Sequence, residues 1–223
     1  MMCAKRKSDV LEIDDNYIIE KYMDSVLSGA DHHKNVYLFC KHNEIEEATF
    51  YSFFGSLDGV KASIWTKMFD NAETALRSDA QYENYDAKTK LLSLFYTLFE
   101  IFALNRSYLL ETVKKEQYKL KDLEQLKAFR KRFKTFVDGI QAYDNQSIPD
   151  KFRQRAKPLY SEGAWIQFLL LFRFWLSDES PKAQKTDILI EKSVNAATDL
   201  LDIKPIESLF DLGKFLWKEG NMR

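Results

Sequence analysis

The sequence is poor in the residues that interrupt regular structure. Its 223 residues include only 7 glycines and 4 prolines, which is too few for the many turns of an all-β protein. An all-α fold is therefore expected. The two cysteines, Cys3 and Cys40, cannot form a disulfide framework. Cys40 falls on the apolar face of a predicted helix, where a small buried thiol is the ordinary expectation.

No apolar run is long enough to cross a membrane. The longest, residues 164–176, contains Gln167 and Arg173 and is shorter than the roughly 20 residues that a bilayer span requires. Residues 1–8 are basic, but the apolar segment of a signal peptide does not follow them. We therefore expect a soluble, cytoplasmic protein.

A strong excess of one charge is also missing. The 33 Lys/Arg and 34 Asp/Glu leave a formal net charge of -1, so no overall field attracts nucleic acid or a membrane. Residues 1–70 carry 8 Lys/Arg against 12 Asp/Glu, a net charge of -4, and the remainder carries 25 against 22, a net charge of +3. A DNA-binding module normally has the opposite asymmetry, because cations at the phosphates supply most of its affinity.

Apolar residues are abundant, at 45% of the chain with 14% aromatic, and they recur at helical spacing. A loop is expected over 144–158, which contains Pro149 and Pro158. We predict helices over residues 14–28, 36–41, 46–54, 57–76, 87–104, 107–115, 120–143, 160–176, 184–201 and 206–218.

The most informative segment is residues 36–56. It predicts two short amphipathic helices joined by a tight turn, with a polar face exposed on the second. A helix-turn-helix needs this arrangement to place its second helix in a DNA major groove. Asn35 is placed to cap the first of these helices and Ser56 to cap the long helix that follows.

The segment Ala-Thr-Phe-Tyr-Ser-Phe-Phe-Gly-Ser at residues 48–56, followed by a long helix and several apolar helices, resembles the TetR family of bacterial repressors. The family signature is matched at five positions. These are Cys40 for its small residue, Ile45 for its apolar turn residue, Thr49 and Tyr51 for its groove-side Thr and Tyr, and Phe54 for its Phe.

The resemblance implies a TetR-like all-α fold with three parts. These are a helix-turn-helix head at 10–56, a linking helix at 57–78, and a ligand-binding and dimerisation domain at 79–223. The predicted helix 160–176 is apolar on more sides than one domain can cover, and the family pairs its penultimate helices between subunits. A homodimer through 160–176 and 184–201 is therefore expected.

The resemblance assigns DNA contacts to six head residues: Lys34, Asn35, Thr49, Tyr51, Ser52 and Lys61. Contacts of this kind go mainly to the DNA backbone. The alternative is that Tyr51 packs within the head, that Thr49 is merely exposed, and that the lysines are ordinary solvated surface residues.

Three departures from the family pattern disfavour DNA binding. Glu44 replaces the Gly of the turn, where a positive φ is commonly needed, so the turn is expected to be altered. Leu57 replaces a Lys that supports phosphate contact. Glu44, Glu46 and Glu47 place three carboxylates near the phosphates, although the helix dipole would favour carboxylates there without any DNA.

A second resemblance lies further along the chain. Residues 174–181, Phe-Trp-Leu-Ser-Asp-Glu-Ser-Pro, followed by Thr186 and Asp187, are similar to a TetR-like branch, and more faintly to the TetR-fold accessory protein of ubiquinone biosynthesis, which holds lipid. The same pattern also arises where one helix stops and another starts.

Eight aromatic residues of the later helices are candidates for contact with an apolar small molecule or lipid. Helical spacing alone predicts only that they are core residues, and the family resemblance implies a ligand chamber within that core. They are Phe95, Phe99, Phe102, Phe133, Phe136, Trp165, Phe168 and Phe172.

Other patterns predict little chemistry. His32, His33 and His42 lack the partners of a metal motif, so neither a metal site nor a cofactor is expected. The basic run at 127–134 is a solvated face or, alternatively, a surface for an acidic partner or membrane. Because no catalytic constellation is present, an enzyme is not expected.

Two functions follow. The first is a dimeric TetR-like transcriptional regulator, whose DNA-binding head is modulated by an apolar ligand in the C-terminal domain. The alternative is a TetR-fold protein that no longer binds DNA and acts as a lipid- or partner-binding module.

Overall fold

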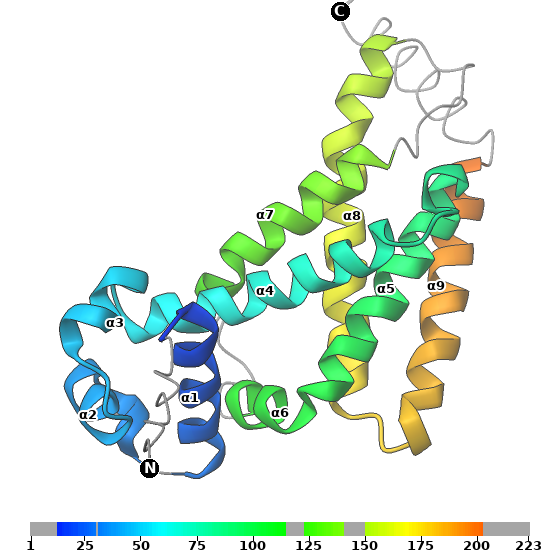
Figure 1. Ribbon diagram of the computed structural model, residues 1–223. Helices are drawn as coiled ribbons and strands as arrows, with labels where there is room; N and C mark the ends of the chain where they lie inside the picture. The colour runs from blue at the N-terminus through cyan, green and yellow to red at the C-terminus, as the bar shows by residue number, and fades with distance from the viewer. Residues whose placement is uncertain (1–12, 30, 115–122, 141–149, 203–223) are drawn as a thin grey trace, which may run out of the picture. The chain divides into compact units, whose positions relative to one another are not determined.

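The computed structural model describes residues 13–29, 31–114, 123–140 and 150–202, and the regular structure in these ranges is entirely helical (Figure 1). The all-α prediction is confirmed. Three short 3-10 segments, η1 (Asp31–Lys34), η2 (Tyr82–Asn84) and η4 (Pro181–Ala183), lie between α-helices. The α-helices are α1 (Asp15–Leu27), α2 (Val36–His42), α3 (Glu47–Phe53), α4 (Leu57–Arg77), α5 (Ala87–Leu104), α6 (Arg106–Lys114), α7 (Leu123–Gly139), α8 (Asp150–Leu176) and α9 (Gln184–Asp202).

Polar side chains fix where several helices begin. Asn35 Oδ1 accepts the backbone N–H of Leu38 at 2.8 Å, at the start of α2. Ser56 Oγ accepts the backbone N–H of Gly59 at 3.1 Å, at the start of α4. Each cap satisfies a backbone donor that has no partner within its own helix. Both capping predictions are confirmed.

The chain divides into two compact units. Unit 1 comprises Met1–Asn71 and Ile101–Arg132, and unit 2 comprises Ala72–Glu100 and Phe133–Arg223. The long helices α4, α5 and α7 each contribute a segment to both units.

Two aromatic groups form the interior of unit 1. In the head, the ring of Phe39 in α2 contacts Tyr22 of α1 and Phe50 of α3, with centroid distances of 6.2 and 5.9 Å. α1 also packs against α6. The second group joins α4, α5 and α7 through rings 5.6–5.8 Å apart, and its members are Trp65, Phe69, Phe102 and Phe129.

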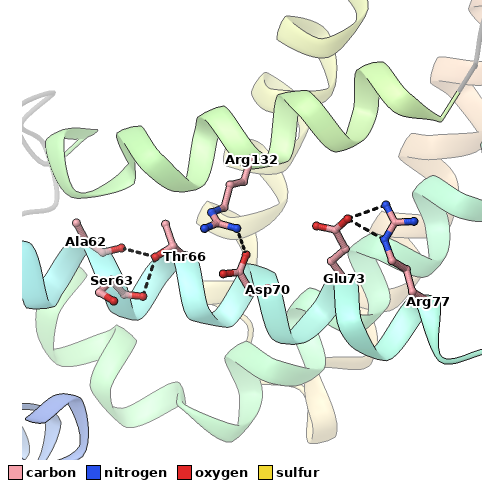
Figure 2. A network of polar contacts seen from close by, with 7 residues as sticks. All are labelled: Ala62, Ser63, Thr66, Asp70, Glu73, Arg77 and Arg132. Carbon is pink, nitrogen blue, oxygen red and sulfur yellow. Dashed lines mark hydrogen bonds and ion pairs between the residues drawn. The ribbon is translucent and has the colours of Figure 1, made fainter. Parts of the chain in front are cut away.

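Polar contacts line α4 (Figure 2). Arg132 of α7 donates to Asp70 at 2.5 Å, and Arg77 donates through two nitrogens to Glu73 one turn before it. The Thr66 hydroxyl donates to carbonyls of the preceding turn. Because these groups are partly solvated, each ion pair adds little stability, and we expect the rings to contribute most of it.

In unit 2, polar side chains tie neighbouring helices together. Lys134 of α7 pairs with Glu162 of α8, and the Gln167 amide of α8 donates to Ser193 Oγ of α9 at 2.9 Å. The buried core of unit 2 includes the aromatic cluster described below. Within the described ranges, no helix is both long enough and apolar enough to cross a membrane.

The predicted loop over 144–158 is wrong for its last nine residues, because α8 already begins at Asp150 and continues through Pro158. Proline lacks a backbone N–H and removes one helical hydrogen bond, which favoured a loop there. The loss is local, and in a helix of 27 residues the remaining turns outweigh it. The predicted ends near 115, 120 and 143 and the helix at 206–218 lie outside the described residues.

Candidate nucleic-acid interface and aromatic cluster

The turn between α2 and α3 keeps the geometry that glycine usually provides. The backbone N–H of Ile45 donates to the Cys40 carbonyl at 2.9 Å, which closes α2 with the bond of a Schellman motif. Glu44 adopts a φ of +56°, in the left-handed region, and Ile45 behind it is buried. The expected alteration of the turn is therefore wrong: Glu44 adopts the strained conformation itself.

Replacing Glu44 with glycine should stabilise the protein. The left-handed conformation costs a residue with a Cβ about 1–2 kcal/mol, while glycine loses roughly 0.5–1 kcal/mol more chain entropy on folding. We expect Glu44→Gly to raise the free energy of unfolding by about 0.5–1 kcal/mol, measured from urea denaturation curves.

Two further substitutions separate backbone strain from charge. Glu44→Ala removes the carboxylate but keeps the Cβ, so it should gain less than Glu44→Gly. Glu20→Gly, in the middle of α1, should lower stability by about 0.5–1 kcal/mol. If the alanine and glycine variants at position 44 proved equally stable, backbone strain would not be the cause.

The outward face of α3 carries three of the predicted DNA contacts. The Tyr51 side chain is 52% exposed, although its ring also meets the buried Phe50 edge-on at 5.5 Å. Ser52 is exposed, and its hydroxyl donates to the carbonyl of Thr49, which is half-buried. Their contact with a DNA groove stays a prediction.

Two of the other three predicted DNA contacts, Asn35 and Lys61, have roles within the protein. Asn35 caps α2, because its Oδ1 accepts the backbone N–H of Leu38. The Lys61 ammonium pairs with Asp58 at 2.8 Å. Lys34 is exposed at the end of η1. Leu57, at the position of the family Lys, is buried, so core packing accounts for that departure.

The surface of the head is acidic. Glu44, Glu46 and Glu47 are all exposed, and none of them forms an ion pair within the described residues. The described head, residues 13–29 and 31–56, contains 3 Lys and 8 Asp/Glu, a net charge of -5. Phosphates near α3 would meet repulsion where most DNA-binding proteins supply cations.

The structure brings His42 against His32, which their separation in sequence did not predict. The rings of His32 and His42 stack at 3.7 Å with planes 12° apart, and His33 lies edge-on to Tyr22. The in-plane nitrogens of stacked rings do not converge on one ion. Among the described residues, no group of three or more His, Cys, Asp or Glu side chains is placed to hold a metal.

The predicted aromatic set is divided between the units. Seven members are buried in unit 2, while Phe102 packs against Trp65 in unit 1. Five of the unit 2 rings form one cluster, in which Phe168 contacts Phe99, Phe133, Trp165 and Phe172 at 5.1–6.5 Å.

Sequence reasoning left Trp175 out of this set. Trp175 is buried and contacts both Phe99 and Phe172. It follows Phe168 by seven residues, so helical spacing along α8 could have identified it. The cluster offers ring faces and edges without charge, and its contact with an apolar ligand stays a prediction.

A separate apolar surface lies on the outside of unit 2. Ile166, Leu170 and Phe174 recur every four residues along α8 and are exposed, with Leu170 at 64%. Ile188 of α9 is also exposed, and α8 and α9 contact each other. These helices are the ones predicted to form the dimer interface.

The basic run of α7 is largely paired with acids. Lys127 pairs with Glu124, Arg132 with Asp70 and Lys134 with Glu162. Phe129 and Phe133 of α7 are buried. The run therefore presents less positive charge than its sequence indicates, which favours a solvated face.

Comparison with known proteins agrees with this architecture. Residues 90–216, more than half of the chain, match the family model described as tetracyclin repressor-like, C-terminal domain. None of the curated proteins compared matches the chain. The all-helical structure and the extent of the match show that the chain belongs to the TetR family.

Proposed function

We propose that this protein is a homodimeric TetR-family regulator in which an apolar ligand in the C-terminal domain changes what the head binds. The single observation that carries the proposal is the helix-turn-helix, whose turn is preserved despite Glu44 and whose α2 is capped by Asn35. In this proposal residues 10–56 form the head, 57–78 link it, and 79–223 bind ligand and dimerise. Proteins of this family are typically regulators rather than enzymes.

The buried aromatic cluster and the exposed face of α8 support the roles of the C-terminal domain. An apolar small molecule or lipid would bind among rings such as Phe133 and Phe168. A second copy would cover Leu170 and its neighbours. The ligand would act by binding one arrangement of the dimer more tightly than another.

DNA is the target that the fold suggests for the head. Each α3 of the dimer would enter a major groove, with Thr49, Tyr51 and Ser52 facing the duplex. A second candidate is a head that no longer binds DNA and contacts another protein. The acidic surface at Glu44, Glu46 and Glu47 favours this second candidate.

Fluorescence anisotropy on a random-sequence duplex separates the two candidates. If the acidic surface prevents DNA binding, the wild-type protein at about 10 μM should not bind the duplex in low salt. The Glu46→Lys/Glu47→Lys protein should then bind the duplex at least about tenfold more tightly than the wild type, because cations near phosphates release counterions. Submicromolar binding by the wild-type protein would exclude the second candidate.

A matched variant controls for net charge. Glu20 and Asp24 are exposed on α1, so Glu20→Lys/Asp24→Lys changes the charge by the same amount on a different helix. It should gain much less than the α3 variant. Equal gains from both would mean that the overall charge of the head, rather than a groove-facing α3, controls association.

A further inference from the structure

The large apolar side chains that unit 1 leaves exposed are concentrated in the head. Among the described residues, nine of the ten exposed large apolar side chains lie either in the head or on α8 and α9, with Leu104 the exception. Exposed apolar groups that gather in one place mark interaction surfaces. In the proposed dimer a second copy covers the exposed apolar residues of α8 and α9. The exposed apolar residues of the head have no such partner in that proposal.

Four of the head residues lie on two short helices that contact each other. Tyr37 and Leu38 belong to α2, and Tyr51 and Phe53 belong to α3. Their side chains are between 38% and 56% exposed, and α2 packs against α3. These four residues lie outside the head core, because the buried residues of the motif are Phe39, Cys40, Ile45, Phe50 and Phe54.

The same helices carry the three exposed carboxylates of the turn and of the start of α3. We call these carboxylates and the four exposed apolar residues together the head face. Lys41, on α2, lies with its Nζ 5.7 Å from the centre of the Tyr37 ring. One cation of the protein therefore already contacts an aromatic ring of this surface. The carboxylates form no ion pairs within the described residues and remain available to cations from outside.

This combination decides the chemistry of the partner. A nucleic acid would bring phosphates against carboxylates, and an anionic membrane would be repelled in the same way. A protein segment with apolar side chains between lysines or arginines would satisfy both the rings and the carboxylates. Each helix of the head face is about 10 Å long, which matches about two turns of a partner helix.

We propose that the head face docks a basic amphipathic helix of another protein, with an apolar side chain against Tyr51 and its cations beside Glu46 and Glu47, since Glu47 and Tyr51 are four residues apart on α3 and share one side of it. The inference rests on the second candidate function above and names the partner class of that head. The surface is small by the standard of stable complexes, so binding should be weak and reversible, in the range of about 10–100 μM.

The test uses the full chain and synthetic probes. The probe is a fluorescein-labelled peptide of about 18 residues, with leucine along one helical face and lysine or arginine elsewhere. Its comparison peptides are a scrambled sequence of the same composition and a twin with glutamate in place of the basic residues. We expect the amphipathic basic peptide to bind at least about fivefold more tightly than either.

Paired variants locate the binding. Glu46→Gln/Glu47→Gln should weaken binding about fivefold or more, and Tyr51→Ala about tenfold. The matched controls, Glu20→Gln/Asp24→Asn and Leu104→Ala, change exposed residues elsewhere in unit 1 and should stay within about twofold of wild type. Light scattering and thermal melting show that each variant keeps its fold and oligomeric state.

Three results would overturn the proposal. These are equal binding of the scrambled peptide, equal loss in the controls and the head-face variants, or tighter binding of a random duplex than of the probe. In none of these cases would dimer formation or ligand binding by the C-terminal domain change, so the regulator proposal is tested separately.

Discussion

Replacing Leu170 with glutamate should convert the protein from a dimer to a monomer at micromolar concentration. Leu170 is the most exposed apolar side chain of the α8 face, at 64%, and a two-fold interface would contain it twice. Each copy would lose roughly 1.5–3 kcal/mol of apolar burial and gain a charge to desolvate. The dimer dissociation constant should therefore rise at least about 100-fold, as measured by sedimentation equilibrium.

Leu104→Glu is the matched control. Leu104 is 86% exposed at the end of α5, in unit 1, and the same change there should leave the dimer intact. A milder variant, Ile166→Ala, removes apolar area without adding charge and should weaken the dimer by an intermediate amount. A wild-type protein that is monomeric at about 10 μM, or a Leu170→Glu protein that dimerises normally, would contradict the proposed interface.

The sequence predicts most of the head because its signals are local. The Asn35 cap and the spacing of Phe39, Ile45 and Phe50 depend on neighbours within a few residues. The conformation of Glu44 was predicted wrongly because family geometry and side-chain type disagree there. The structure shows that the Schellman hydrogen bond and the buried Ile45 accompany the strained conformation.

Contacts between residues far apart in the sequence could not be predicted from local signals. Phe102 has the same helical spacing as Phe95 and Phe99, yet it packs in unit 1 while they pack in unit 2. The stacked rings of His32 and His42 come from segments ten residues apart. Helical spacing in the sequence predicts which side chains are buried, but not which residues they contact.

The loop between α8 and α9 contains a hydrogen-bond network centred on Asp178. The sequence predicted a break at residues 178–181. In the structure, the Asp178 carboxylate accepts four hydrogen bonds, two from the backbone N–H and hydroxyl of Ser180 and two from those of Thr186. The next residues include Lys182 and Ala183 with φ of +54° and +56°, so the loop contains strain that this network opposes.

Replacing Asp178 should cost more stability than any other loop substitution considered. Asp178 and Thr186 are both buried, so Asp178→Ala leaves the Thr186 N–H and hydroxyl without their acceptor. We expect a loss of about 3 kcal/mol in the free energy of unfolding, a large part of the roughly 5–15 kcal/mol typical of a domain. Chemical denaturation of the two proteins at neutral pH measures the difference.

The same carboxylate should make stability depend on pH. Burial raises the pKa of Asp178, but the hydrogen bonds from Ser180 and Thr186 outweigh it and lower the pKa from 3.8 to about 2. Because the folded pKa lies below the unfolded value, the contribution is present above about pH 4 and is lost as the pH falls towards 2. It amounts to about 2 kcal/mol.

Asp178→Asn separates charge from geometry. Asparagine keeps one acceptor oxygen but does not titrate, so this variant should lose less stability than Asp178→Ala and lack this part of the acid dependence. Glu179→Gln, at the exposed neighbouring position, should behave like the wild type. If wild type and Asp178→Asn lost stability in parallel between pH 4 and 2, the hydrogen-bonded carboxylate would not control this loop. Because the loop leads directly into α9, loss of its hydrogen-bond network should also weaken the proposed dimer.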